Sequence, residues 1–125
     1  MTFVGSNFVG KGFPLSFIAN ADAILTAHYV FETDKQGPPN IVHGGATCAV
    51  LDEAMTAAMF YHEQSAMTVH MEVNWQAPIL IGDETTIRGW LVRQEGRKLY
   101  LEASIHDSKN ILCASAKALF IVIST

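Results

Sequence analysis

Residues 45–61 read GATCAVLDEAMTAAMFY, and this stretch decides the fold. Its alanines, methionines and leucine favour an α-helix, which we predict over residues 45–62. Asp52 and Glu53 are its only charged residues, so the helix has no polar face to turn toward water. Most of its sides must therefore be covered. A single antiparallel sheet curled around one central helix would cover them.

Strand patterns flank the predicted helix on both sides. Directly after it, apolar and polar residues alternate over 67–75, which is the pattern of a half-buried strand. Tight turns at 95–96 and 107–110 join the later strands and make neighbours antiparallel. The predicted strands cover residues 13–19, 24–32, 67–75, 84–94, 97–106 and 111–123. The result is an α+β fold of two strands, one helix and four strands, with an irregular lead-in over 1–12 and a loop over 34–40.

The composition fits one domain spanning residues 1–125. The chain carries 8 Lys+Arg against 12 Asp+Glu, and this acidic balance argues against a nucleic-acid surface. No signal peptide and no run of about 18 apolar residues stands out, which predicts a cytoplasmic protein without a membrane partner. Cys48, Cys113 and the five histidines lack metal-ligand spacing, so we expect free thiols and no metal.

The start of the predicted helix has the features of a binding site. Gly44 and Gly45 let another molecule approach the backbone closely, and the N–H groups of the first turn carry the positive end of the helix dipole. Such an end can hold a carbonyl oxygen or a developing oxyanion. The alternative is that the two glycines only shape a tight turn from loop to helix.

Asp52 follows Gly44 by eight residues, which places it about 12 Å further along the helix axis. One chain cannot aim both groups at a single carbonyl, so their cooperation requires antiparallel helices from two subunits. An acid in an apolar helix is costly without partners, so at least one of Asp52 and Glu53 should line a cleft. Periodicity does not choose between them, and polar groups of the sheet could instead satisfy both. The 50% hydrophobic content agrees with a buried homodimer interface.

Further motifs accompany this segment. They are Asn-Ile-Val-His-Gly-Gly at 40–45, Leu-Asp-Glu-Ala-Met at 51–55, Thr-Val-His-Met-Glu-Val at 68–73, Pro78, Gly82 and Gly-Arg at 96–97. Together they resemble the hotdog-fold acyl-CoA thioesterases, most closely the small PaaI-like group of the phenylacetate pathway. The resemblance covers most of the chain and implies a curved antiparallel sheet around one long helix. It also implies hydrolysis of an acyl-CoA to a free acid and coenzyme A, without a cofactor, by a homodimer or a dimer of dimers.

The resemblance implies roles for individual residues. Gly44 would supply the backbone N–H that polarises the thioester carbonyl. Asp52 would activate water or attack the carbonyl directly, and Thr68 would orient the water. His43 would shape the pocket, and Thr56 matches a polar position used in a related branch.

Other candidate residues are expected to contact the bound substrate away from its reacting atoms. Gly45 and Glu53 belong to this group through their positions beside Gly44 and Asp52. The family also has a loop amide ahead of its His-Gly-Gly motif. That place is taken here by a glycine at position 37, which Gln36 and Asn40 flank, so either amide could serve.

Arg97 and Lys98 lie with Arg93 near a predicted hairpin turn. They could meet the phosphates of coenzyme A, and a solvated turn is the alternative explanation. Two other functions also stay open: a non-catalytic acyl-CoA-binding dimer, and a hotdog dehydratase or hydratase that uses a histidine and an acid. His43 followed directly by two glycines resembles the thioesterases more closely.

Overall fold

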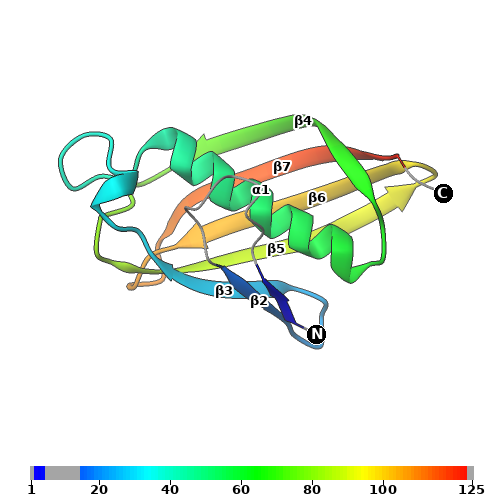
Figure 1. Cartoon of the computed structure of the whole chain (residues 1–125), viewed down its shortest axis with the longest axis horizontal. Coiled ribbons are helices and arrows are strands. Elements are labelled where there is room, and N and C mark those ends of the chain that lie inside the picture. The colour runs from blue at the N-terminus through cyan, green and yellow to red at the C-terminus, as the bar shows by residue number, and fades with distance from the viewer. Residues whose placement is uncertain (1, 5–14, 124–125) are drawn as a thin grey trace.

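The structure is a computed structural model that describes residues 2–4 and 15–123. One helix lies across one face of a curved antiparallel sheet (Figure 1), which confirms the predicted architecture. The sheet has the strand order β1-β2-β3-β5-β6-β7-β4. Its elements are β1 (Thr2–Val4), β2 (Ser16–Ala19), β3 (Leu25–Val30), the 3-10 helix η2 (Thr33–Lys35), α1 (Gly44–Tyr61), β4 (Ala66–Trp75), β5 (Glu84–Glu95), β6 (Lys98–His106) and β7 (Leu112–Val122).

The predicted helix and the four strands after it are confirmed to within one residue at each end. The chain before the helix differs more. An irregular lead-in was the wrong prediction for Thr2–Val4, because these residues form a strand that pairs with β2. The rest of the lead-in, and the start of the predicted strand at 13–19, lie outside the described residues. Three strands therefore precede the helix, since β1 extends the sheet beyond the two expected.

Half of α1 is buried against the sheet, because its apolar residues recur on more than one side. Its nine buried residues are Thr47, Val50, Leu51, Glu53, Ala54, Met55, Ala57, Ala58 and Met59. The close approach of helix to sheet depends on Gly89 in β5. A Cβ at Gly89 would lie 2.5 Å from the carbonyl carbon of Ala54, where real Cβ atoms are not found. Only glycine fits between helix and strand at this position.

A bulge interrupts β4 and changes which side chains face the helix. Thr68 pairs with Phe120 and His70 pairs with Leu119, so Val69 is an extra residue. Residues directly opposite one another share a face of the sheet, and Phe120 is buried under the helix. Thr68 therefore lies on the helix side. Unbroken alternation over 67–75 was the wrong prediction, because it puts Thr68 on the same face as His70.

β4 is also an edge strand, paired on one side only, with β7. None of its residues is buried, and Met67, Val69 and Trp75 are 53%, 51% and 54% exposed. Met71 and Val73 are partly buried against the core, so the predicted half-buried strand is confirmed at these positions and wrong at Met67, Val69 and Trp75. Large exposed apolar side chains on an edge strand mark a surface that another chain can cover.

Candidate active site

The first turn of α1 is closed by its own N-cap. The Gly45 N–H donates to Nδ1 of His43 at 2.9 Å, and the Thr47 N–H donates to the His43 carbonyl oxygen at 3.1 Å. A Cβ at Gly45 would lie 3.1 Å from Nδ1, which is tighter than most real Cβ contacts. His43 and Gly45 therefore fit each other, and the Gly45 amide is already used within the chain.

Gly44 differs from its neighbour. It is exposed, and a Cβ there would meet only the Trp75 ring, at an ordinary 3.7 Å. Its N–H has no hydrogen-bond partner among the described residues. The tight-turn explanation accounts for Gly45 but not for Gly44. The free amide at the start of a helix is suited to hold an anionic or carbonyl oxygen of another molecule.

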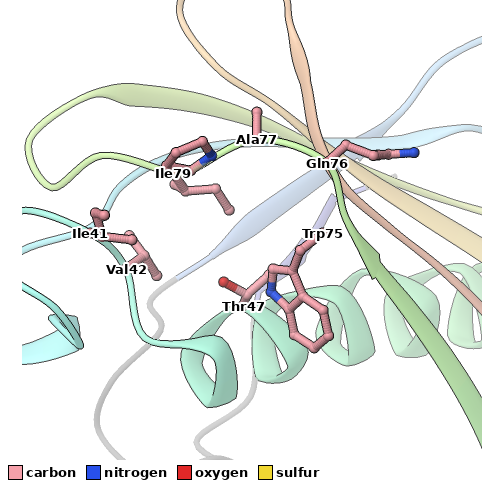
Figure 2. Close-up of a pocket in the computed structure, with 8 residues that line it drawn as sticks. Ile41, Val42, Thr47, Trp75, Gln76, Ala77 and Ile79 are labelled. Carbon is pink, nitrogen blue, oxygen red and sulfur yellow. The ribbon is translucent and has the colours of Figure 1, made fainter.

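A hollow of about 300 Å³ lies beside this turn. The indole of Trp75 lies next to the first turn of α1 and next to Thr47, as Figure 2 shows. The other lining residues are Ile41, Val42, Gln76, Ala77, Pro78 and Ile79. Trp75 is a candidate site residue that the sequence did not indicate, because the alternating pattern predicts only that it is apolar.

Asp52 lies half-buried on the side of α1 that faces the start of β4. The Thr68 hydroxyl donates to Oδ1 of Asp52 at 3.3 Å. Burial raises the pKa of Asp52 above its ordinary value, and the Thr68 hydrogen bond partly opposes this rise. The β4 bulge and the helix thus bring together two residues that are 16 apart in sequence. A partly desolvated carboxylate with a raised pKa accepts a proton more readily than an exposed one, which suits Asp52 to act as a general base.

The space around this carboxylate is a cavity of about 590 Å³, here called the Asp52 cavity. Asp52, Thr56 and Thr68 are its polar lining residues, so three of the predicted site residues meet there. Its other lining residues are Met59, Phe60, Ala66, Met67, Phe120 and Ile123. Polar groups are therefore confined to one part of an otherwise apolar cavity.

The structure separates the two neighbouring acids. Glu53 is only 4% exposed and belongs to the buried side of α1, whereas Asp52 lines the cavity. Of the two carboxylates left open by the sequence, Asp52 is the one that a substrate can reach.

The structure also keeps Gly44 and Asp52 apart. Both belong to the single straight element α1, eight residues from one another. At 1.5 Å per residue they are about 12 Å apart along the axis, as expected from the sequence. One chain therefore presents the two halves of the predicted site at separate places.

The loop ahead of α1 is held by the side-chain amide of Gln36 and by the backbone of Asn40. The Asn40 N–H donates to Oε1 of Gln36 at 2.9 Å. Asn40 has a φ of 65°, a conformation that asparagine tolerates, and its carbonyl oxygen accepts from the Ile81 N–H at 2.9 Å. These bonds hold the loop against His43, whose N–H donates to the Lys35 carbonyl oxygen at 2.7 Å.

The candidate cations lie at the hairpin between β5 and β6. Nε and Nη2 of Arg97 donate to the Val122 carbonyl oxygen at 3.1 and 2.7 Å. Arg93 pairs with Glu95 at 2.7 Å and lies over the Tyr100 ring. Lys98 is exposed at the start of β6. These three cations do not line the Asp52 cavity.

The described residues carry no candidate metal site and no candidate membrane-spanning helix. That part of the chain holds no group of three or more His, Cys, Asp or Glu that could bind a metal ion. It also holds no helix long and apolar enough to cross a membrane. Cys48, half-buried on α1, and the buried Cys113 are both free thiols.

Comparison with known proteins places this geometry in a family. The family model described as "Thioesterase superfamily" matches residues 39–114, a range that includes the α1 start, Asp52 and Thr68. The chain belongs to this superfamily, and its sheet and central helix form the hotdog fold that the sequence predicted.

Individual relatives agree with this assignment. The acyl-coenzyme A thioesterase THEM4 of Rattus norvegicus is 34% identical over 115 residues, which cover 90% of this chain and 49% of the relative. The chain spans half or less of the length of the THEM4 proteins that it matches.

Solved structures show the same fold. A hypothetical thioesterase protein with coenzyme A from Streptococcus pneumoniae TIGR4 superposes with a TM-score of 0.82 at 14% identity, over 89% of this chain and 87% of that one. The E. coli PaaI protein from the phenylacetic acid degradation operon gives 0.78 at 14% identity, over 84% and 80%.

Proposed function

We propose that the protein is an acyl-CoA thioesterase, in which Asp52 of one chain acts with Gly44 of a second chain. The observation that carries the proposal is the Asp52–Thr68 pair, a reachable carboxylate at the polar part of an apolar cavity. The membership of the thioesterase superfamily and the similarity to a named acyl-CoA thioesterase support it.

The reaction needs little more than these groups. Asp52 takes a proton from a water that Thr68 helps to orient, and the water oxygen attacks the thioester carbon. The negative charge on the carbonyl oxygen is stabilised by the Gly44 N–H. The C–S bond then breaks, and the leaving thiolate takes the proton back from Asp52, which gives free acid and coenzyme A. Direct attack by Asp52 on the carbonyl carbon, followed by hydrolysis of the resulting anhydride, uses the same groups.

The two halves of the site meet only if two chains pack together. The exposed apolar residues of β4 and the unburied stripe of α1 are the surfaces that we assign to contact with a second copy. In that stripe Cys48, Asp52 and Thr56 follow one another at a spacing of four, so they share a face of the helix. Two antiparallel α1 helices, related by a twofold axis, place each Gly44 opposite the partner's Asp52. Packing of two such pairs into a tetramer stays a prediction.

This arrangement makes a specific prediction about Cys48. It lies midway between Gly44 and Asp52, so the twofold axis passes beside it and the two copies of Cys48 face each other. Packed helices lie about 8–10 Å apart, which brings facing Cα atoms to about 4–5 Å, within the range of a disulfide. We expect mild oxidation to join two chains through Cys48, as seen by non-reducing electrophoresis. Burial raises the pKa of the Cys48 thiol, so the oxidation is run at about pH 9.

Two matched variants control this experiment. Cys48→Ala should abolish the cross-linked pair. Cys113→Ala should leave it unchanged, because Cys113 is fully buried inside one chain. The antiparallel dimer would be contradicted by a cross-linked dimer that depends on Cys113. Sedimentation of the protein as a monomer would contradict it as well.

The remaining candidates have roles at the edges of this site. Arg97 and Lys98 are exposed cations, and we assign them to the phosphates of coenzyme A. Gln36 and Asn40 support the loop that holds His43, and through it the Gly44 turn. Thr56 is a further hydroxyl beside Asp52 in the cavity.

The proposed function is tested by thiol release from a panel of acyl-CoAs of different chain length. We expect release of coenzyme A from at least one member at a rate well above the uncatalysed reaction. Saturable binding without thiol release would instead favour a non-catalytic acyl-CoA-binding dimer. A change in absorbance of an enoyl-CoA without thiol release would favour a hydratase.

A further inference from the structure

The Asp52 cavity is polar at one end and apolar at the other, along the direction of α1. Its polar groups, Asp52, Thr56 and Thr68, lie within about one helical turn of one another. Beyond them the lining consists of Met59, Phe60, Ala66, Met67, Phe120 and Ile123, toward the C-terminal end of α1. A thioester carbonyl held at Asp52 would therefore point its acyl chain into the apolar part.

We propose that this cavity selects uncharged, aliphatic acyl chains of up to about ten carbons. The proposal rests on the proposed thioesterase function, and names the class of acyl group for the same site. Its three supports are the charge of the lining, the length of the cavity and the openness of its far end.

The lining excludes a charged acyl chain. None of the nine described lining residues is a lysine, an arginine or a histidine, and the only ionisable group among them is the Asp52 carboxylate. A second carboxylate on the substrate would be buried without a partner, close to a like charge. Lys117, three residues before Phe120, does not line the cavity, and the Arg97 guanidinium is turned to the Val122 carbonyl oxygen.

The length follows from the helix. Asp52 and Phe60 are eight residues apart on α1, about 12 Å along its axis. An extended carbon chain advances about 1.2 Å per bond, so about ten bonds span this distance. Met59 and Met67 flank the path with flexible thioethers, which adapt to a chain that does not fill the space.

In the single chain the far end of the cavity, about 18 Å along α1 from the proposed twofold axis at Cys48, is open rather than blocked. Phe60 is 50% exposed and Ile123 is 58% exposed. A chain longer than ten carbons can pass between them, but its additional methylenes lie in water. Binding should therefore strengthen with chain length up to about ten carbons and then level off.

Binding of alkyl thioethers of coenzyme A tests this inference separately from catalysis, because a thioether has no carbonyl to hydrolyse. Titration calorimetry with S-butyl-, S-decyl- and S-hexadecyl-coenzyme A is expected to show a gain in affinity of roughly two- to fourfold per methylene up to decyl. Hexadecyl should bind within about threefold of decyl. A thioether whose terminal carboxylate would lie inside the cavity, S-(4-carboxybutyl)-coenzyme A, should bind at least tenfold more weakly than S-pentyl-coenzyme A, its uncharged counterpart.

Two variants test the residues. Ala66→Phe fills the cavity and should lower the ratio of decyl to butyl affinity at least tenfold, while Ala21→Phe, the same change in an exposed turn, should leave the ratio unchanged. Phe60→Ala, at the helix surface, should lower the ratio by a smaller factor and keeps the test available if Ala66→Phe does not fold. Three outcomes would overturn the inference. They are equal affinity for the butyl and decyl thioethers, a continued gain in affinity from decyl to hexadecyl, and equal affinity for the carboxylated probe and its uncharged counterpart. Thioether affinity that rises with chain length, without any release of thiol from acyl-CoAs, would overturn the thioesterase function but not the inference about the acyl chain.

Discussion

Asp52→Ala is expected to lower kcat/KM for acyl-CoA hydrolysis by about 10²–10⁴-fold, the usual contribution of a positioned general base. The variant removes the only ionisable group among the described residues that line the Asp52 cavity, and leaves Thr68 without this partner. The Gly44 amide and the fold should persist, so substrate binding should change much less than turnover. Thiol release measured over a range of substrate concentrations separates the two.

The pH dependence supplies a second readout of the same residue. Asp52 must be ionised to take a proton, and burial raises its pKa, so kcat/KM should fall as the pH is lowered through that raised value. Thr68→Val removes the hydrogen bond that lowers the pKa, and should move this fall to higher pH.

The stability of an isosteric variant tests the cause of the pKa shift. A raised pKa means that the folded state binds the proton more tightly than the unfolded state, so this stabilisation is present at low pH and is lost as the pH rises through the raised pKa. At neutral pH the half-buried carboxylate is therefore a cost. Asp52→Asn should be inactive, yet at least as stable as the wild type at neutral pH.

Asp22→Asn, the same change at an exposed turn residue, serves as the control and should alter neither activity nor stability. Undiminished hydrolysis by Asp52→Ala and Asp52→Asn would remove Asp52 from its proposed role.

Gly89→Ala is expected to have the largest effect on stability. The added methyl group would lie within 2.5 Å of the carbonyl carbon of Ala54, and backbone on both sides leaves no flexible group to yield. Helix and sheet must separate locally, which should lower the free energy of unfolding by about 1–3 kcal/mol or more. Thermal unfolding at fixed protein concentration should show a fall in Tm of about 5–15 °C.

Gly82→Ala separates this steric effect from backbone strain. Gly82 has a φ of 84°, and a Cβ there would meet no atom within 4 Å. Its substitution should cost only the strain of a left-handed residue, about 1 kcal/mol. Gly89→Ala as stable as Gly82→Ala would mean that α1 and β5 can move apart freely.

Some of these features follow from patterns within a few residues. The helix was predicted because the alanines, methionines and leucine of 45–61 favour a helix, and its burial because that helix has no polar face. Both patterns depend only on neighbours along the helix. The antiparallel order of β5, β6 and β7 was predicted because turns of two to four residues allow no other connection. The separation of Gly44 and Asp52 along α1 was predicted from the helical rise alone.

Other features depend on residues that are distant in sequence. The bulge at Val69 is set by pairing with β7, about fifty residues further along the chain, so unbroken alternation gave Thr68 the wrong face. The choice between Asp52 and Glu53 was open for a similar reason, since an apolar helix does not reveal which side the sheet covers. The different roles of Gly44 and Gly45 emerged only from the atoms that a Cβ would meet.

The sequence by itself therefore determined the central helix, the antiparallel sheet and the residues that could form a site. Only the tertiary structure decided which acid is reachable, that Thr68 meets it, and that no described residue accepts from the Gly44 amide. The physical reason is that helix and turn patterns are local, whereas the exposure and partners of a side chain depend on strands brought together from far apart in the chain.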